Sequence, residues 1–150
     1  MRERQFHKVS PAVWRSRRFN SLPDDPRVLW FYFATGPHQT SAGCSRIPPA
    51  YASADLGWSA ERYAAGKSEL VAADLIVADD EANEIYVCRW FQHCPPTNAK
   101  HAAGIASNIY ALDSDIIRER VEADFAETLW GGRFLDSPGR AINGDGEAYE

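Results

Sequence analysis

Two cysteines and a histidine close together in the sequence are the residues of this chain that could bind a metal. Cys88, His93 and Cys94 lie in the segment CRWFQHCPP, and thiolates and imidazoles are ligands that zinc prefers. Zinc sites generally use four ligands in two closely spaced pairs, whereas this segment has no CxxC pair and no second pair. We therefore expect core packing at Cys88, no metal site and no cofactor, and free thiols at these cysteines and at Cys44.

Neighbouring carboxylates could act as general acids and bases in catalysis. Asp24 and Asp25 stand at a predicted helix start, and Asp79 and Asp80 stand in a predicted turn. Capping and solvation account for aspartates in such places. The sequence also has no glycine-rich phosphate loop, no nucleophile elbow and no metal triad. It therefore predicts a protein that is not an enzyme.

Positive charge, which could bind nucleic-acid phosphates, is concentrated in the first third of the chain. The formal net charge of all 150 residues is -5. Residues 1–46 hold eight basic and three acidic side chains, a net charge of +5, whereas the other 104 residues hold eight basic and eighteen acidic side chains, a net charge of -10. Phosphate contacts are therefore expected from N-terminal arginines, above all Arg15, Arg17, Arg18 and Arg46.

The elements that would present side chains to DNA are two helices between residues 47 and 73. Gly57 suits the left-handed end of the first helix, and Ser59 can cap a second helix two residues later. Such a short connection is typical of a helix-turn-helix motif. We expect the first helix to bury Tyr51, Ala54 and Leu56, and the second to bury Ala60, Tyr63, Leu70, Val71 and Ala73. The outward face of the second helix should carry Glu61, Arg62, Ala65, Ser68, Glu69 and Ala72.

A β-hairpin is predicted directly after this motif, in the place of a wing. Residues 75–77 and 85–90 are rich in β-branched and aromatic side chains, and the polar segment ADDEANE separates them. Its tip should hold four uncompensated acids, which would repel phosphates and could instead contact a basic partner protein: Asp79, Asp80, Glu81 and Glu84.

Further helices should complete the fold. Asp25 can cap a helix that begins at Pro26 and ends before Gly36. Two more helices are expected, one at about 99–111 and one capped by Asp113 or Ser114. Residues 5–9 are expected as an edge strand and residues 38–46 as a polar loop. One core should bury the large side chains of Phe33, Tyr63, Leu70, Ile76 and Trp90.

These elements together predict a mainly α protein with a small β-hairpin, which is a winged helix-turn-helix plus C-terminal helices. We place this domain in residues 1–130 and a flexible acidic tail in residues 131–150. The sequence has neither a signal peptide nor an apolar run long enough to span a membrane. We therefore expect a cytoplasmic protein. The sequence carries no signal for an oligomeric state.

Six segments in the same order resemble the N-terminal winged-helix domain of phage and prophage replication-initiation proteins, over about the first 125 residues. They are KVSPAVW, SLPDDPRVLWFYFATGPH, RIPPAYASADLGWS, LVAADLIV, EIYVCRWF and CPPTNAKH. The resemblance implies a winged-helix fold, double-stranded DNA as the ligand, replisome proteins as partners and no catalysis. Ser59 and Arg62 match positions where the recognition helix of this family can meet DNA. The helix phase places Lys67 at the edge of the same face.

This second helix also departs from the family pattern. Ala64 and Ala65 stand where basic residues are expected, and Lys67 stands where an apolar residue is usual. Gly66 in the middle of a helix costs about 1 kcal/mol relative to alanine, which suggests either close packing against its backbone or a weakly constrained helix.

Two functions therefore stay open from the sequence. The first is a phage-type winged-helix DNA-binding protein with a role in replication or regulation. The alternative is an acidic winged-helix module that binds a basic partner protein, such as a phage-encoded inhibitor or a nucleic-acid mimic.

Overall fold

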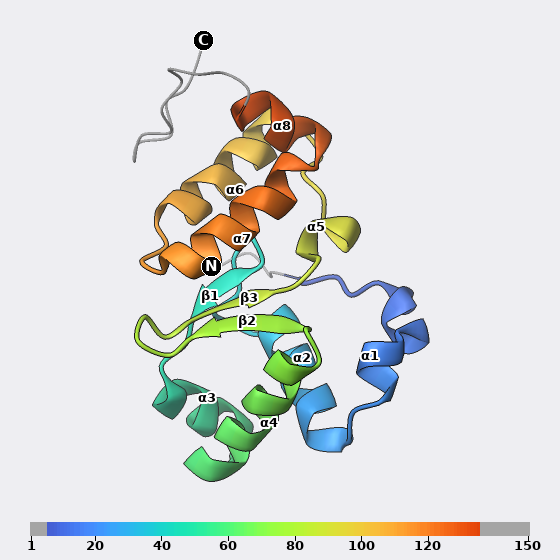
Figure 1. Ribbon diagram of the computed structural model, residues 1–150, viewed down its shortest axis with the longest axis vertical. Helices are drawn as coiled ribbons and strands as arrows, with labels where there is room; N and C mark the ends of the chain where they lie inside the picture. Colours follow the sequence, from blue (N-terminus) through green and yellow to red (C-terminus); the bar gives the residue numbers. More distant parts are fainter. Residues whose placement is uncertain (1–5, 136–150) are drawn as a thin grey trace.

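The computed structural model describes residues 6–135 and is mainly helical with one small antiparallel sheet (Figure 1). The predicted fold class is thus confirmed. A short 3-10 helix, η1, spans Pro11–Arg15. It is followed by α1 (Arg17–Asn20), α2 (Asp24–Thr35), β1 (Cys44–Arg46), α3 (Pro49–Leu56), α4 (Ala60–Ala72), β2 (Ile76–Asp79), β3 (Glu84–Val87), α5 (Trp90–His93), α6 (Ala99–Tyr110), α7 (Asp115–Ala126) and α8 (Leu129–Leu135).

The sheet has the strand order β1-β3-β2, so β3 is its central strand. β2 and β3 form the predicted hairpin, in which Val77 lies opposite Tyr86. On the other side, Cys44 of β1 also lies opposite Tyr86. Residues 38–46 were expected as a loop, and β1 is therefore a correction. Three residues are too few to show a strand period, and β1 forms because β3 offers it an open edge.

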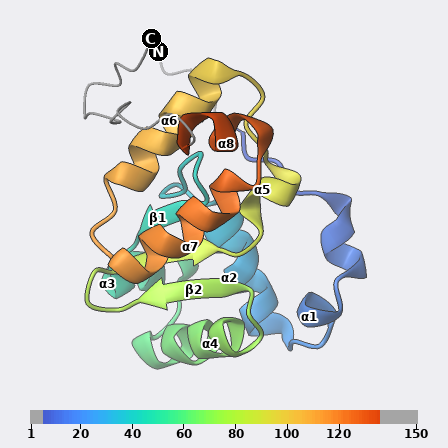
Figure 2. The same ribbon diagram turned by 45° about the horizontal axis from the view of Figure 1, so that its top comes forward.

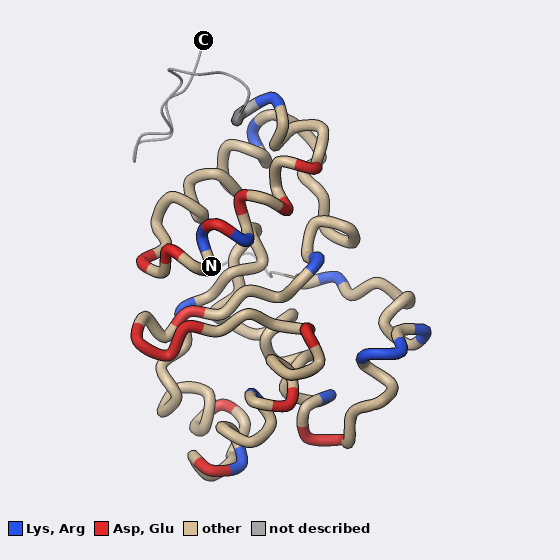
Figure 3. Tube along the Cα trace, in the orientation of Figure 1, with Lys and Arg blue, Asp and Glu red and all other residues tan. Residues whose placement is uncertain are grey.

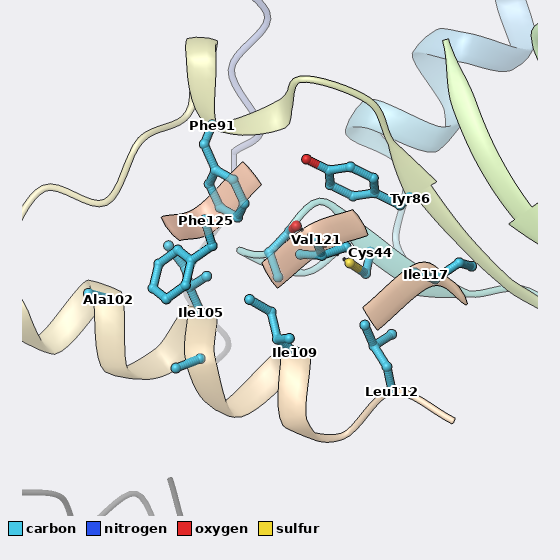
Figure 4. Close-up of a cluster of buried hydrophobic side chains, with 12 residues drawn as sticks. Cys44, Tyr86, Phe91, Ala102, Ile105, Ile109, Leu112, Ile117, Val121 and Phe125 are labelled. Atoms are coloured by element: carbon cyan, nitrogen blue, oxygen red, sulfur yellow. Dashed lines mark hydrogen bonds between the residues drawn. The ribbon is translucent and has the colours of Figure 1, made fainter. Parts of the chain in front are cut away.

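Helices cover both faces of this sheet (Figures 1 and 2). Side chains alternate between the two faces, as the strand geometry requires. Ile76, Ile85 and Val87 pack in one core cluster with α2, α3 and α4. Cys44 and Tyr86 pack in a second cluster with α6 and α7 (Figure 4). The sheet is therefore the middle of three layers.

α2 and α4 pack closely in the first cluster. Phe33, Tyr63, Leu70 and Ile76 are at most 2% exposed and lie in this one cluster, as predicted. Trp90 is only partly buried, and it packs against both clusters because it lies just after the central strand. 

Gly66 of α4 explains how these two helices approach. A Cβ atom at this position would lie 3.3 Å from Leu29 Cδ2 of α2 and 3.8 Å from Trp58 Cζ3. The glycine in mid-helix therefore marks close packing against its backbone, and not a weakly constrained helix.

The predicted inner face of α3 is wrong by about one residue. Tyr51 is 58% exposed and Ala54 is exposed, whereas Ala52 is buried and Leu56 is partly buried. Ala52 and Leu56 are four residues apart and share one helix face. Tyr51 instead stacks on the ring of His38, with ring centroids 6.0 Å apart. A larger apolar side chain was thus mistaken for the core-facing one.

Two residues of the predicted buried stripe of α4 are also more exposed than predicted. Val71 is 46% exposed, and Ala60 is exposed. α2 begins at Asp24 with Pro23 as its N-cap residue, two residues before the predicted cap at Asp25.

Both ends of the described chain differ from the prediction. Residues 6–10 form no strand. The predicted strand at 85–90 is also shorter, because β3 ends at Val87 and Arg89, with a left-handed backbone of φ 59, is the N-cap residue of α5. Residues 131–135, predicted as flexible tail, belong to α8. Gly131 N donates to Thr128 Oγ1 at 2.9 Å, and Trp130 packs against the second cluster. The rest of the predicted tail, residues 136–150, lies outside the described residues.

The C-terminal helices begin at side-chain caps. Asn98 Oδ1 accepts a hydrogen bond from His101 N at 2.8 Å at the start of α6. Ser114, one of the two predicted caps, accepts from Ile117 N at 3.2 Å at the start of α7. None of the helices within residues 6–135 is long and apolar enough to cross a membrane.

Two buried tyrosines give a matched test of this packing. Tyr86 Oη donates to Asp124 Oδ2 of α7 at 2.6 Å, whereas Tyr63 Oη is buried and finds no partner among the described residues. We expect Tyr86→Phe to lower the free energy of unfolding by about 1 to 2 kcal/mol. Tyr63→Phe should leave it within about 0.5 kcal/mol or raise it, because an unsatisfied hydroxyl is removed. Urea unfolding measures both, and a larger loss for Tyr63→Phe would contradict the assignment.

Candidate binding surface of the helix-turn-helix and wing

The turn between α3 and α4 has the geometry that the sequence predicts. Gly57 ends α3 in the left-handed conformation with φ 70. Ser59 Oγ then accepts a hydrogen bond from Arg62 N at 3.1 Å and caps α4. The Ser59 side chain therefore stabilises the start of α4. The predicted outward face of α4 is confirmed, because all six of its residues are exposed: Glu61, Arg62, Ala65, Ser68, Glu69 and Ala72.

Arg62, the expected DNA contact on α4, is bound to a carboxylate of α2. Its Nε lies 2.7 Å from Asp25 Oδ2 and its Nη2 lies 2.8 Å from Asp25 Oδ1. Its guanidinium also lies over the ring of Trp58, 4.3 Å from the centroid. The hydrogen bond from Arg62 lowers the pKa of Asp25, and Asp25 in turn raises the pKa of Arg62. In the free protein this arginine is therefore directed at α2.

Lys67 lies deeper than the edge position expected for it. Its side chain is 12% exposed, and its Nζ forms an ion pair with Asp80 at the wing tip. The Nζ atom also lies 5.7 Å from the ring centroid of Tyr63. Lys67 therefore links α4 to the wing and does not stand free for a phosphate.

The acidic wing tip differs from the four uncompensated acids predicted. Asp79 Oδ1 accepts from Glu81 N at 3.0 Å and from Ala82 N at 3.2 Å, which closes the turn. A hydrogen bond with Ser114 and these backbone contacts lower the pKa of Asp79. Asp80 is exposed but paired with Lys67, and Glu81 is exposed.

Glu84 is not at the wing tip, and this corrects the prediction. It belongs to β3 and is 3% exposed. Its carboxylate accepts hydrogen bonds from Ser114 N at 2.7 Å and from Asp113 N at 3.0 Å. A carboxylate at the start of a helix satisfies free N–H groups and complements the helix dipole. Glu84 therefore holds α7 on the sheet and is unavailable to a partner.

A groove of about 640 Å³ lies between the Ala60–Ala64–Val71 side of α4 and the strand β2. Most of its lining is small or apolar, and its only charged lining residues are the paired Lys67 and Asp80. The acids Glu61 and Glu81 are exposed on α4 and at the wing tip, the elements that border it, whereas Glu69 faces α2 and lines another pocket with Arg62 and Asp25. The groove is lined by Pro49, Ala60, Tyr63, Ala64, Lys67, Ser68, Val71, Ala72, Ala78 and Asp80.

The N-terminal arginines lie elsewhere. Arg15, Arg17 and Arg18 are exposed on η1 and α1, and none forms an ion pair with another residue of the described range. α1 and the wing tip are on opposite sides of the molecule (Figures 1 and 3). Arg46 of β1 lies opposite Glu84 at the wing end of the sheet, and its Nη1 lies 3.2 Å from Asp113 Oδ2. The predicted DNA contacts therefore do not form one continuous surface.

The cysteines pack as ordinary core or boundary residues. Cys44 and Cys88 are buried, Cys94 is partly buried, and all three are free. Burial raises the pKa of each thiol. Within residues 6–135, no three His, Cys, Asp or Glu side chains gather in a way that could hold a metal ion.

The sequence predicted neither the ion pair of Arg62 with Asp25 nor the groove. The groove had a partial signal, because the small residues Ala60, Ala64 and Ser68 recur every four residues along the predicted helix, although Ala60 was expected to be buried. The Arg62 ion pair had no such signal, since its partners are 37 residues apart.

Comparison of this chain with protein-family models, curated proteins and solved structures gave no match. The likeness to phage replication-initiation proteins therefore stays a resemblance of sequence motifs.

The Arg62 ion pair can be tested by titration. Asp25 should titrate below its ordinary pKa of 3.8 in the wild type and near that value in Arg62→Ala. Because Asp25 has a lower pKa in the folded than in the unfolded protein, its ion pair stabilises the fold fully at a pH above the pKa of the unfolded state. This stabilisation is lost as the pH falls through the pKa of the folded state. Carboxyl-carbon NMR measures the shift. An unchanged Asp25 pKa in the variant would show that the pair does not persist in solution.

Proposed function

We propose that this chain is a winged-helix protein-binding module, which receives an amphipathic helix of a basic partner protein in the groove between α4 and β2. It acts by binding and not by catalysis. The groove carries this proposal, because a contiguous apolar surface exposed beside polar residues is typical of a protein-interaction site.

The chemistry of this face favours a protein over DNA. Specific contacts to DNA bases come mostly from arginine, lysine, asparagine and glutamine. The exposed face of α4 offers only Arg62 among these, and Arg62 is paired with Asp25. Alanines and Val71 make the remaining surface apolar.

The charge of this face points the same way. The groove is lined by the paired Lys67 and Asp80, and two exposed acids belong to the elements that border it, Glu61 on α4 and Glu81 at the wing tip. These four side chains carry a net charge of -2. Phosphates would be repelled by it, whereas lysine or arginine on a partner would be attracted.

A helix is the occupant that fits an elongated apolar groove bordered by a helix and a strand. Amphipathic helices bind such grooves through apolar side chains at positions i, i+3, i+4 and i+7. Small side chains at Ala60, Ala64 and Ser68 allow a partner backbone to come close to α4. Basic residues on the flanks of the partner helix would then meet Glu61 and Glu81.

Selection from a random peptide library on the immobilised protein tests this proposal. Peptides that bind should carry apolar residues at helical spacing together with lysine or arginine. Ala64→Arg places a long cationic side chain in the groove and should weaken these peptides at least about tenfold by calorimetry, because both shape and charge oppose binding.

Ala65→Arg is the matched control. Ala65 is the next residue of α4 and is also exposed, but it does not line the groove. It should change affinity much less than Ala64→Arg. Equal effects of the two variants, or peptides without basic residues, would contradict the proposal.

A second candidate function is binding to double-stranded DNA in replication or regulation, as the sequence resemblance implies. One observation favours it, namely that Arg15, Arg17 and Arg18 are exposed and unpaired within the described part of the chain. Phosphate contacts of this kind position a protein on DNA without reading its sequence. Replisome proteins would then be its partners.

Titration with random duplex DNA at low and moderate salt tests the second candidate. Binding through these arginines should weaken steeply with salt. Replacing both Arg17 and Arg18 by alanine should reduce the affinity for all duplexes alike and flatten the salt slope by about two, one for each phosphate contact. Arg62→Ala should have little effect. Absence of binding by the wild type at low salt would exclude this function.

A further inference from the structure

A second, smaller pocket lies away from the groove, between the N-terminal segment and the end of the sheet. Its volume is about 240 Å³. Apolar side chains from α1, α2, β3 and the residue before β2 line it, namely Phe19, Trp30, Leu75 and Val87. Phe19, Leu75 and Val87 are buried core residues, so this wall of the pocket is preformed. η1 and α5 provide the remaining walls.

The charged residues of this pocket are all basic. Lys8, Arg18 and Arg89 line it together with His93, and no aspartate or glutamate does. Arg89 is bound to Asp74 through its Nη1, which lies 3.1 Å from Asp74 Oδ2. Lys8 and Arg18 are exposed and form no ion pair with any residue of the described range. The chain as a whole has a net charge of -5, so a pocket lined by three cations and no acid differs in charge from the rest of the molecule.

We propose that this pocket binds a small amphiphilic anion, which is a carboxylate on an aromatic or compact apolar body. The apolar body would lie against Trp30 and Phe19, and the carboxylate would meet Arg18 and Lys8. Arginine is suited to this contact because its guanidinium can donate two parallel hydrogen bonds to one carboxylate.

The size and position of the pocket select the ligand class. Pockets for drug-sized ligands begin at roughly 300 Å³, so this one suits a ligand with a single ring system. Its apolar wall includes the core residues Phe19, Leu75 and Val87, and these offer no hydrogen bond or charge to the phosphates of a DNA backbone. The site is also formed by other elements than the groove, so this inference does not depend on the proposed protein-binding function.

Calorimetry with two probes of matched shape tests the proposal. The anion 1-naphthoate should bind with one-to-one stoichiometry, and its neutral analogue naphthalene-1-carboxamide should bind at least about tenfold more weakly, because a charged hydrogen bond is replaced by a neutral one. NMR should show shifts of the indole N–H signals of Trp30 and Trp90, which both line the pocket. Equal binding of the two probes, or shifts at other tryptophans alone, would overturn the proposal.

Neighbouring arginines provide the matched variants. Arg18→Glu should weaken 1-naphthoate at least about tenfold, whereas Arg17→Glu makes the same charge change on the same helix at a residue that does not line the pocket. Ala12→Phe narrows the pocket from η1 without changing its charge and should also weaken binding. Equal effects of the two charge variants would indicate a general attraction to the N-terminal charge, and unchanged binding in Ala12→Phe would place the probe elsewhere. Either result would overturn the proposal.

Discussion

The burial of the central strand β3 on both faces is the constraint on which the rest of the structure depends. Alternate side chains of one short strand belong to two separate core clusters, with Ile85 and Val87 in one and Tyr86 in the other. A winged helix-turn-helix needs only the first of these clusters. The second exists because α6 and α7 cover the outer face of the sheet, and the polar contacts of Glu84 and Tyr86 with α7 fix their position. The base of the wing therefore belongs to the core.

This arrangement gives acidic residues of the wing different roles. Glu84 has lost its solvent shell and gains hydrogen bonds from two backbone N–H groups at the start of α7. Burying a carboxylate is costly unless such partners are present. Asp79 closes the turn, and only Asp80 and Glu81 remain exposed at the tip. A sequence with four acids in six residues thus contains two structural acids and two that a partner can reach.

The parts of the fold that the sequence predicted depend on local signals. Ser59, Gly57 and Ser114 act on backbone groups within a few residues, so their roles can be read from neighbours in the chain. Contacts between distant segments could not be read this way. The pairing of β1 with β3, the contact of Glu84 with residues 113 and 114 and the Arg62 ion pair each join residues at least 29 positions apart. The sequence therefore predicted the helix that carries the candidate site residues, but not the ion pairs of Arg62 and Lys67.

Lys67 shows how a departure from the expected pattern can be explained by this architecture. An apolar residue is usual at its position in the replication proteins that the chain resembles, and most of the Lys67 side chain is indeed buried. Lysine can bury its aliphatic stem and still place its charge at the surface. Here the stem lies beside Tyr63, and the ammonium group reaches Asp80 on the wing. An apolar side chain could fill the same space but could not make this link. The ion pair therefore bridges the two sides of the groove, and it favours one width for the surface that a partner would meet.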